Sequence, residues 1–206
     1  NFEILENDYG ISLRELVAFA ERTYEPVPDG ATGLAAKLTP LAKAVNVLLF
    51  KLEGQIIMRH GSFDMHDRLL LERIDVEAGT VELYDGTVYE LATRDFPTLD
   101  PEHPYELTPE EARIVEKLVA EFTSADHLRR HIEFLYSHGS MYLVRNHNLL
   151  FHGCVPLNED GTFSSMNCLG TWRSGRDYLD FCDEIARRAW RERNEDSLDW
   201  MWYLWI

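Results

Sequence analysis

The chain has 206 residues, an apolar fraction of 45% and a net charge of −16. This length suffices for one domain with a sizeable core, or for a domain with an insertion. The negative charge argues against nucleic acid and anionic membranes as partners, and a phosphate-bearing substrate would need metal ions and a few local arginines to bind to such a surface.

The first two predicted helices lie in the N-terminal quarter of the chain. Ser12 and Glu15 match a capping box, so a helix is predicted to begin there, with an apolar stripe through Ala20. After a loop at 24–32, apolar residues at helical spacing predict a long helix over 33–58, with a proline near its start.

The next segments mix a helix with a hairpin. Residues 64–74 are predicted to be helical, with Asp64 as the cap. Residues 80–91 form the clearest hairpin pattern in the chain, because two β-rich runs flank Asp85-Gly86, a dipeptide typical of type I′ turns.

Two more helices are expected after an irregular connection at 92–106. Thr108 is followed by Pro109 and two glutamates, which is a strong signal for a helix start. A second helix is predicted from Ala125, or the residue before it, to Gly139.

The stretch 139–163 is the centre of the chain's organisation. Two apolar runs, 141–144 and 149–151, flank the polar turn 145–148, which predicts a hairpin of two short buried strands. A further strand pair at 163–173 and an amphipathic helix at 176–193 follow.

The second strand of this hairpin leads into His152-Gly153. An imidazole at the end of a buried strand, followed by glycine, can present a metal ligand, although by pattern alone a hydrogen-bonded structural histidine is favoured. Cys154 could share a strand face with His152 as a nucleophilic pair, but a small buried cysteine is the favoured interpretation. His127 and His131 have the i, i+4 spacing of metal ligands, but an exposed helix face is favoured.

Cysteine spacing and apolar runs indicate the cellular compartment of the protein and what covers its C-terminal run. Its three cysteines, Cys154, Cys168 and Cys182, lack paired spacing, which is typical of a reduced, cytoplasmic protein. The most apolar window, 42–50, is too short to span a membrane, so no membrane partner is expected. The run 198–206 carries three tryptophans and must be covered by this chain, by another copy, or by residues beyond it, so we expect the chain to be part of a larger polypeptide.

Five stretches of the sequence resemble the class III, Firmicute-type fructose-1,6-bisphosphatases. They are Phe50–Ile57, Asp67–Ile74, Phe96–Asp100, Gly139–Leu143 and Leu149–Cys154. The resemblance implies an α/β fold, namely part of a calcineurin-like metallophosphoesterase β-sandwich flanked by helices. Residues 1–138 would be a mainly helical insertion with a small hairpin at 80–91, and residues 139–206 would be part of the α/β core.

The resemblance also implies a function. The whole enzyme would hydrolyse the 1-phosphate of fructose 1,6-bisphosphate, a step of gluconeogenesis, with two manganese ions that activate a hydroxide for in-line attack. His152 matches a metal ligand of the superfamily, and Arg145 and Arg59 are candidates for binding the sugar phosphate, against the alternative of solvated surface charges. The other metal-binding motifs of the superfamily are not in this sequence, so we expect the chain alone to be inactive.

Two other functions remain open from the sequence. One is a non-catalytic interaction or regulatory module, which fits the missing ligands, the apolar helix predicted over 33–58 and the aromatic C-terminal run. Such a module could bind a partner or form a homo-oligomer. The other is a phosphoesterase with the same mechanism and a different substrate.

Overall fold

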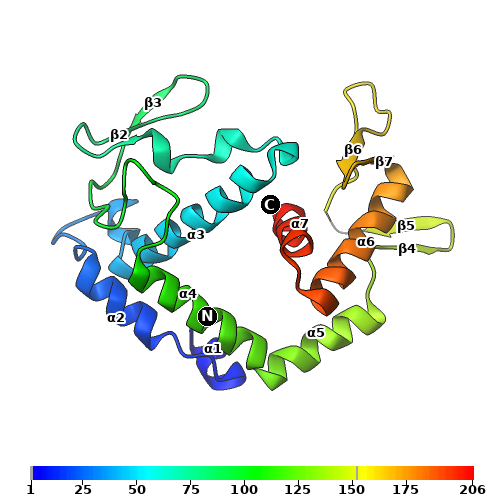
Figure 1. The fold of residues 1–206 in the computed structure, drawn as a ribbon, viewed down its shortest axis with the longest axis horizontal. Coiled ribbons are helices and arrows are strands. Elements are labelled where there is room, and N and C mark those ends of the chain that lie inside the picture. The colour runs from blue at the N-terminus through cyan, green and yellow to red at the C-terminus, as the bar shows by residue number, and fades with distance from the viewer. Residues whose placement is uncertain (1, 152) are drawn as a thin grey trace. The chain divides into compact units, whose positions relative to one another are not determined.

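The computed structural model describes residues 2–151 and 153–206, so the predicted metal ligand His152 lies outside the described residues. The described chain is mixed α/β, with many helices and small antiparallel sheets (Figure 1). It divides into two compact units, and the boundary falls after Arg129, inside helix α5 (Asp126–His138). The division predicted at 138, between an insertion and a catalytic core, stays a prediction.

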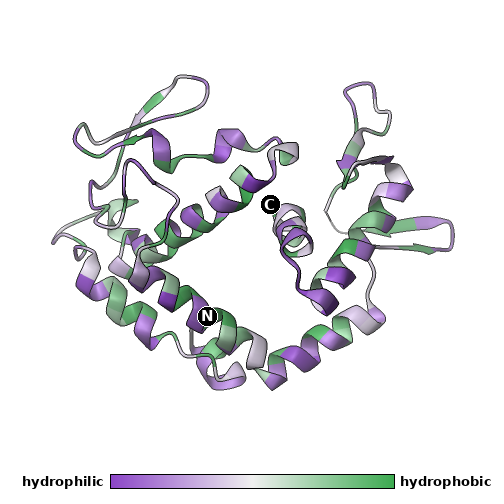
Figure 2. Cartoon of the chain, in the orientation of Figure 1, coloured by the Kyte–Doolittle hydropathy of each residue, from purple (hydrophilic) through white to green (hydrophobic). Residues whose placement is uncertain are grey.

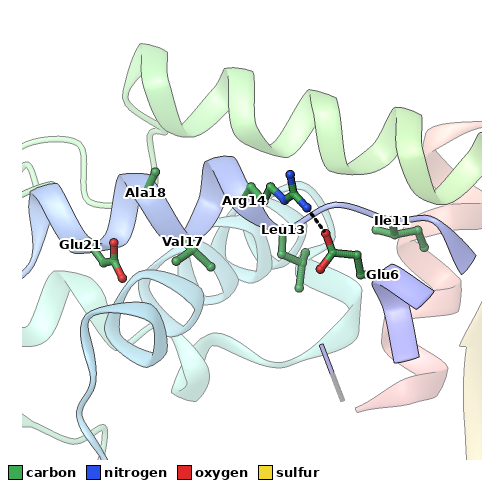
Figure 3. Close-up of a pocket in the computed structure, with 7 residues that line it drawn as sticks. All are labelled: Glu6, Ile11, Leu13, Arg14, Val17, Ala18 and Glu21. Atoms are coloured by element: carbon green, nitrogen blue, oxygen red, sulfur yellow. Dashed lines mark hydrogen bonds and ion pairs between the residues drawn. The ribbon is translucent and has the colours of Figure 1, made fainter. Parts of the chain in front are cut away.

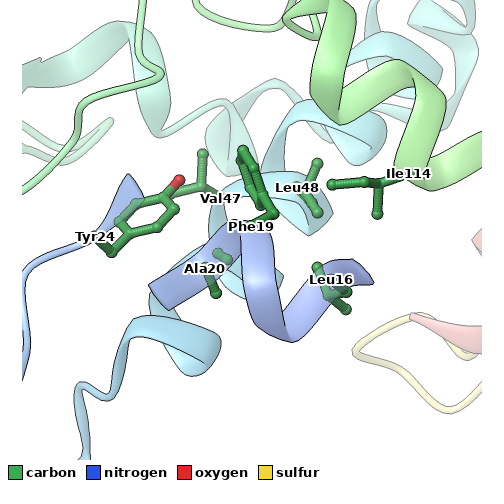
Figure 4. Close-up of a cluster of buried hydrophobic side chains, with 8 residues drawn as sticks. Leu16, Phe19, Ala20, Tyr24, Val47, Leu48 and Ile114 are labelled. Atoms are coloured by element: carbon green, nitrogen blue, oxygen red, sulfur yellow. The ribbon is translucent and has the colours of Figure 1, made fainter. Parts of the chain in front are cut away.

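The first unit contains α1 (Phe2–Tyr9), α2 (Arg14–Thr23), α3 (Pro40–Arg59) and α4 (Pro109–Ser124). Colouring by hydropathy shows apolar and polar residues alternating along these helices, as expected for helices with one buried face (Figure 2). The buried faces of α2, α3 and α4 form one core, shown in Figure 4, which consists of Leu16, Phe19, Ala20, Tyr24, Ala44, Val47, Leu48 and Ile114.

Helix α3 begins later than its apolar pattern predicts. Pro40 is its first residue, and the Thr39 side chain accepts a hydrogen bond from the backbone N–H of Ala42 at 3.2 Å. The predicted start at residue 33 is wrong, because the residue before a proline avoids helical backbone and Thr39 is extended. Residues 35–37 form only a 3₁₀ turn.

The capping box predicted at Ser12 and Glu15 is also wrong. Helix α2 begins two residues after Ser12, whose backbone N–H donates to the Glu121 carboxylate at 2.6 Å. The Glu15 carboxylate instead accepts from Arg113 and Lys117 of α4, and so it does not return to the helix start. A local signal has here been overridden by ion pairs between two helices.

The start of α4 is confirmed, and it is tied to a buried ion pair. The Thr108 hydroxyl accepts from the Glu111 N–H at 3.2 Å, and the Glu111 carboxylate accepts from the Thr108 N–H at 2.7 Å, which completes a capping box. The same carboxylate accepts from the Lys51 ammonium at 2.7 Å, and both side chains have an exposed fraction of 0%. Lys51 also donates to the Thr98 carbonyl oxygen at 2.7 Å.

The connection 92–106 is irregular, as predicted, but an ion pair and hydrogen bonds hold it along α3. Lys43 pairs with Asp95 at 2.6 Å, and the Gln55 side chain donates to the Tyr105 carbonyl oxygen at 2.7 Å. Gly54 lies inside α3 beneath the Tyr105 ring, where an added Cβ would come within 2.1 Å of a ring carbon. This glycine is therefore required for close packing rather than for a break in the helix.

The helix predicted over 64–74 is wrong. The segment forms short 3₁₀ turns at His66–Arg68 and Leu71–Arg73, after a first one at Gly61–Phe63. Asp64 takes a left-handed backbone with φ 53°, which a residue capping the start of a helix does not adopt. The segment is fixed by burial of Phe63, Leu69 and Leu71 instead of by helical hydrogen bonds.

The hairpin predicted over 80–91 is confirmed. Strands β2 (Thr80–Glu82) and β3 (Val88–Glu90) pair antiparallel, and the short β1 (Ile74–Asp75) joins β2 on its other side. The turn differs from the predicted type I′, because Gly86 has a positive φ and Asp85 does not.

Among its described residues, the second unit holds most of α5, two hairpins and two further helices. Strands β4 (Tyr142–Arg145) and β5 (Asn148–Phe151) form the predicted central hairpin, and β6 (Ser165–Cys168) pairs with β7 (Thr171–Ser174). Helix α6 (Gly175–Glu192) follows as predicted, and α7 (Glu195–Trp205) ends the chain.

The prediction that the β4–β5 strands are buried is wrong for this chain. Its apolar side chains have exposed fractions between 46% and 62%; they are Leu143, Val144, Leu149, Leu150 and Phe151. The cause is that a two-stranded ribbon has two faces, and the described residues supply no layer that covers either one fully.

The core of the second unit lies along α6. The Phe181 ring meets Trp200 of α7 edge-on, with ring centroids 4.9 Å apart, so the aromatic C-terminal run docks partly on this helix. Cys168 and Cys182 are buried there, and burial raises the pKa of the Cys182 thiol to about 11. Cys154 is exposed, which corrects the expectation of a buried thiol at that position.

Candidate metal centre

The β4–β5 hairpin determines where the predicted site residues lie in the second unit. Arg145 pairs with Asn148 at the turn, and Tyr142 pairs with Phe151 at the open end. Asn146 and His147 both have positive φ, at 51° and 62°, as a two-residue type I′ turn requires. Phe151, at the open end, is the last residue before His152.

This register places Arg145 away from the open end of the hairpin. Arg145 lies three residues from the open end, which corresponds to about 10 Å of strand. Its side chain is exposed. Arg59 is the exposed last residue of α3, in the first unit. The roles of His152, Arg145 and Arg59 stay predictions.

Gly153 follows His152 and has a backbone φ of 99°. An added Cβ at this position would meet no atom within 4 Å, so backbone conformation, and not lack of space, requires a glycine here. The chain bends at Gly153.

The open end of the hairpin is held against α6 by polar contacts. The Tyr142 hydroxyl donates to Asp180 at 2.7 Å and accepts from the Arg176 guanidinium at 3.1 Å. These contacts raise the pKa of Arg176, first through its hydrogen bond to Tyr142. They hold the start of β4 beside α6. Tyr142 is half-buried, and Arg176 and Asp180 are exposed.

A second set of contacts anchors the segment before β4. Arg187 pairs with Asp183 at 2.6 Å, and it donates to the backbone carbonyl oxygens of Tyr136 and Gly139. The Met141 N–H donates to the same Asp183 at 3.3 Å. Sequence reasoning missed these anchors, although the i, i+4 spacing of Asp183 and Arg187 on α6 was a readable signal.

The described residues do not assemble a metal site by themselves. No group of three or more His, Cys, Asp or Glu side chains with ligand geometry occurs among residues 2–151 and 153–206. His127 and His131 lie on an exposed face of α5, as expected. A dinuclear centre needs several carboxylate and imidazole donors, so the residues present do not fit two metal ions, and no catalytic step through metals follows from them.

Two hollows lie near the hairpin and beside α2, respectively. One, of about 480 Å³, lies on the Tyr142, Val144 and Leu149 face of the hairpin, with Arg176 at its edge. The other, of about 320 Å³, lies beside α2, and the exposed pair of Glu6 and Arg14 crosses it at 3.1 Å (Figure 3). The second is lined mainly by apolar and ion-paired side chains and offers no nucleophile.

The fold is thus a mixed α/β arrangement in which one hairpin leads to a single predicted metal ligand. A family model described as Firmicute fructose-1,6-bisphosphatase matches the chain over residues 1–206. The chain belongs to this family.

Similar proteins include enzymes named class 3 fructose-1,6-bisphosphatase. The protein of Clostridium novyi (strain NT) is 45% identical, that of Listeria innocua 43% and that of Clostridium tetani 40%, each over 100% of this chain. The matched region is 33% or 34% of each relative, so the chain spans about a third of the length of the relatives it matches. No solved structure matches the chain. No described helix is long and apolar enough to cross a membrane.

Proposed function

We propose that this chain acts within a longer polypeptide that hydrolyses the 1-phosphate of fructose 1,6-bisphosphate. The observation that carries the proposal is the match to the fructose-1,6-bisphosphatase family along the whole chain. The identity of 40% to 45% to enzymes of that name, which are about three times longer, supports it. The chain would then supply part of an active site.

The exposed β4–β5 hairpin supports a place in a metallophosphoesterase-type β-sandwich. Directly paired residues point to the same side, so Val144 and Leu149 share one face, and Leu143 and Leu150 share the other. Both faces are apolar, which is typical of strands that are covered on two sides. In the proposed fold, strands from outside these residues cover them.

The proposed metal centre holds two divalent ions, manganese by preference, with His152 as one ligand. The bend at Gly153 and the polar contacts that hold β4 on α6 would give such a ligand a defined direction. The other donors would come from the rest of the polypeptide. Arg145 and Arg59 are proposed to contact the sugar phosphate.

The test compares variants of the full-length polypeptide. His152→Ala is expected to remove nearly all manganese-dependent phosphate release from fructose 1,6-bisphosphate and to lower the bound manganese, as measured by plasma mass spectrometry. His147→Asn is the matched control, because it changes a histidine of the same hairpin and asparagine tolerates the left-handed backbone there. Wild-type activity and metal content in His152→Ala would exclude His152 as a ligand, and a panel of other sugar phosphates tests the substrate.

A second candidate function is a non-catalytic interaction module. The exposed apolar hairpin, and the absence of a metal-ligand group among the described residues, favour it. It predicts self-association or partner binding by the full-length polypeptide after metal is removed with a chelator. A monodisperse monomer in light scattering, together with phosphatase activity, would count against this candidate.

A further inference from the structure

A cavity of about 390 Å³ lies in the first unit, and none of the predicted site residues His152, Arg145 and Arg59 lines it. It is formed by the first half of α3, the β1 and β2 strands and the connection after β3. Most of its lining is apolar, with Val47, Phe50, Leu71, Ile74, Val81 and Phe96 among the lining residues. Its volume falls in the range of about 300 to 1,000 Å³ that is typical of sites for small molecules.

The polar part of the lining is built around one buried ion pair. The Lys43 ammonium donates to Asp95 at 2.6 Å and to the Glu25 carbonyl oxygen at 3.1 Å, and both charged side chains are only 8% exposed. Asn46 lies one turn further along α3, and the Thr93 hydroxyl accepts from the Asp95 N–H at 3.1 Å. Lys43, Asp95 and Thr93 therefore lie together in one part of an otherwise apolar cavity.

The ion pair selects the charge of a ligand. Lys43 and Asp95 neutralise each other, so a buried anion would face the Asp95 carboxylate and a buried cation would face the Lys43 ammonium. Two of the three N–H bonds of Lys43 have partners among the described residues, which leaves one donor. An uncharged hydroxyl or amide can accept from Lys43 and donate to Asp95 without a charge of its own.

Residues from stretches outside the proposed phosphatase site line the cavity. Phe50, Leu71, Ile74 and Phe96 come from three of the five stretches that resemble the family. None of these three stretches contains His152, Arg145 or Arg59. The chain brings them together around this cavity.

We propose that this cavity binds an uncharged small molecule with an apolar body and one hydroxyl or amide group. The apolar body would contact Phe50, Val81 and Phe96, and the polar group would meet the Lys43–Asp95 pair. This proposal goes beyond the proposed hydrolysis and does not depend on it.

The first experiment uses benzyl alcohol as the probe, with benzoate and benzylamine as its anionic and cationic counterparts. Binding to the full-length protein is measured by saturation-transfer NMR. Benzyl alcohol is expected to bind at least tenfold more tightly than either charged analogue. If benzyl alcohol does not bind, for example because a side chain from outside these residues fills the cavity, the proposal is overturned. Equal binding of all three probes also overturns it.

The second experiment locates the probe. Val81→Phe would fill the cavity and is expected to abolish binding of benzyl alcohol. Val88→Phe makes the same change on the exposed neighbouring strand and is expected to leave binding unchanged. Unchanged binding in Val81→Phe overturns the proposal.

A third measurement needs no variant, in case Val81→Phe fails to fold. A crystal of the wild-type protein with 4-bromobenzyl alcohol is expected to give an anomalous bromine peak beside Phe50 and Val81. A peak elsewhere, or none, overturns the proposal. None of these measurements uses phosphatase activity, so failure here is distinguishable from failure of the proposed function.

Discussion

A buried ion pair between Lys51 and Glu111 lies inside the first unit. Lys51 and Glu111 are fully buried, and their ion pair is reinforced by the Thr98 carbonyl oxygen and the Thr108 N–H. Such a pair adds little over an apolar core of the same volume, but loss of one member leaves an uncompensated buried charge. The effect of the pair on stability is therefore measured best by removing the Lys51 ammonium alone.

Lys51→Met is expected to destabilise the first unit by about 3 to 5 kcal/mol, because Glu111 would keep its buried charge without a cation. The measurement is the free energy of unfolding from urea denaturation. Lys37→Met, which removes an exposed ammonium at a 3₁₀ turn, serves as the control and should change stability little. Equal stability of Lys51→Met and wild type would contradict the buried pairing.

Glu15 should make stability depend on pH. Hydrogen bonds from Lys117 and then Arg113 lower the pKa of Glu15 to about 2 from 4.5. As pH falls, the unfolded chain therefore binds a proton at Glu15 before the folded chain does. The ion pairs of Glu15 stabilise the folded chain above pH 4.5, and this stabilisation is lost between about pH 4.5 and 2. In Glu15→Gln, the midpoint of thermal unfolding should depend less on pH between about 4.5 and 2 than in the wild type. An unchanged pH dependence would contradict the pairing.

At the scale of elements, local signals predicted some of the structure and tertiary contacts decided the rest. The start of α4 and both predicted hairpins followed from capping and turn residues. The segment 64–74 did not become a helix, because burial of Leu69 and Leu71 and the left-handed Asp64 outweigh helical spacing. No sequence pattern reveals which ion pairs will override a capping box, as at Glu15.

The candidate site could be predicted only in part, for a related reason. The hairpin that leads to His152 was readable from two apolar runs and a polar turn. The contacts that hold it, such as Tyr142 to Asp180, join residues 38 positions apart, and such long-range pairs leave no local pattern.

The β4–β5 turn offers a test at this scale. His147 adopts a left-handed backbone, which costs roughly 1 kcal/mol for a residue with a side chain and almost nothing for glycine. His147→Gly, which creates the favoured Asn-Gly dipeptide, should stabilise the second unit by up to about 1 kcal/mol. His147→Val should destabilise it, since a branched side chain fits this backbone poorly. Thermal unfolding measures both, and a reversed order would refute the type I′ turn.

At the scale of the whole molecule, exposed apolar surface is the main feature of the second unit. Leu143 and Leu150 lie opposite each other on one face of the hairpin, with exposed fractions of 55% and 53%. Alone in solution, such a two-stranded apolar ribbon has unpaired edges and uncovered faces, which promote association between copies. A protein that supplies the missing cover would not show this behaviour.

We therefore expect the 206-residue chain alone to self-associate and Leu143→Thr/Leu150→Thr to reduce that association. Threonine keeps β-propensity and lowers the apolar area. Val119→Thr is the control, because Val119 is similarly exposed, at 58%, on helix α4. Light scattering over a concentration series measures the effect, and equal association of all three proteins would show that the hairpin is not responsible.

The fastening of the irregular connection along α3 has a consequence for how the chain tolerates change in length. Asp95, Thr98 and Tyr105 contact Lys43, Lys51 and Gln55 in the same order along the helix. Asp95 and Thr98 are only three residues apart, whereas Lys43 and Lys51 are eight residues, or about 12 Å, apart along α3. The seven residues from Thr98 to Tyr105 accompany only four helix residues, or about 6 Å, so an insertion is accommodated more easily there. The length of the connection is therefore constrained more tightly between Asp95 and Thr98 than that of an ordinary surface loop.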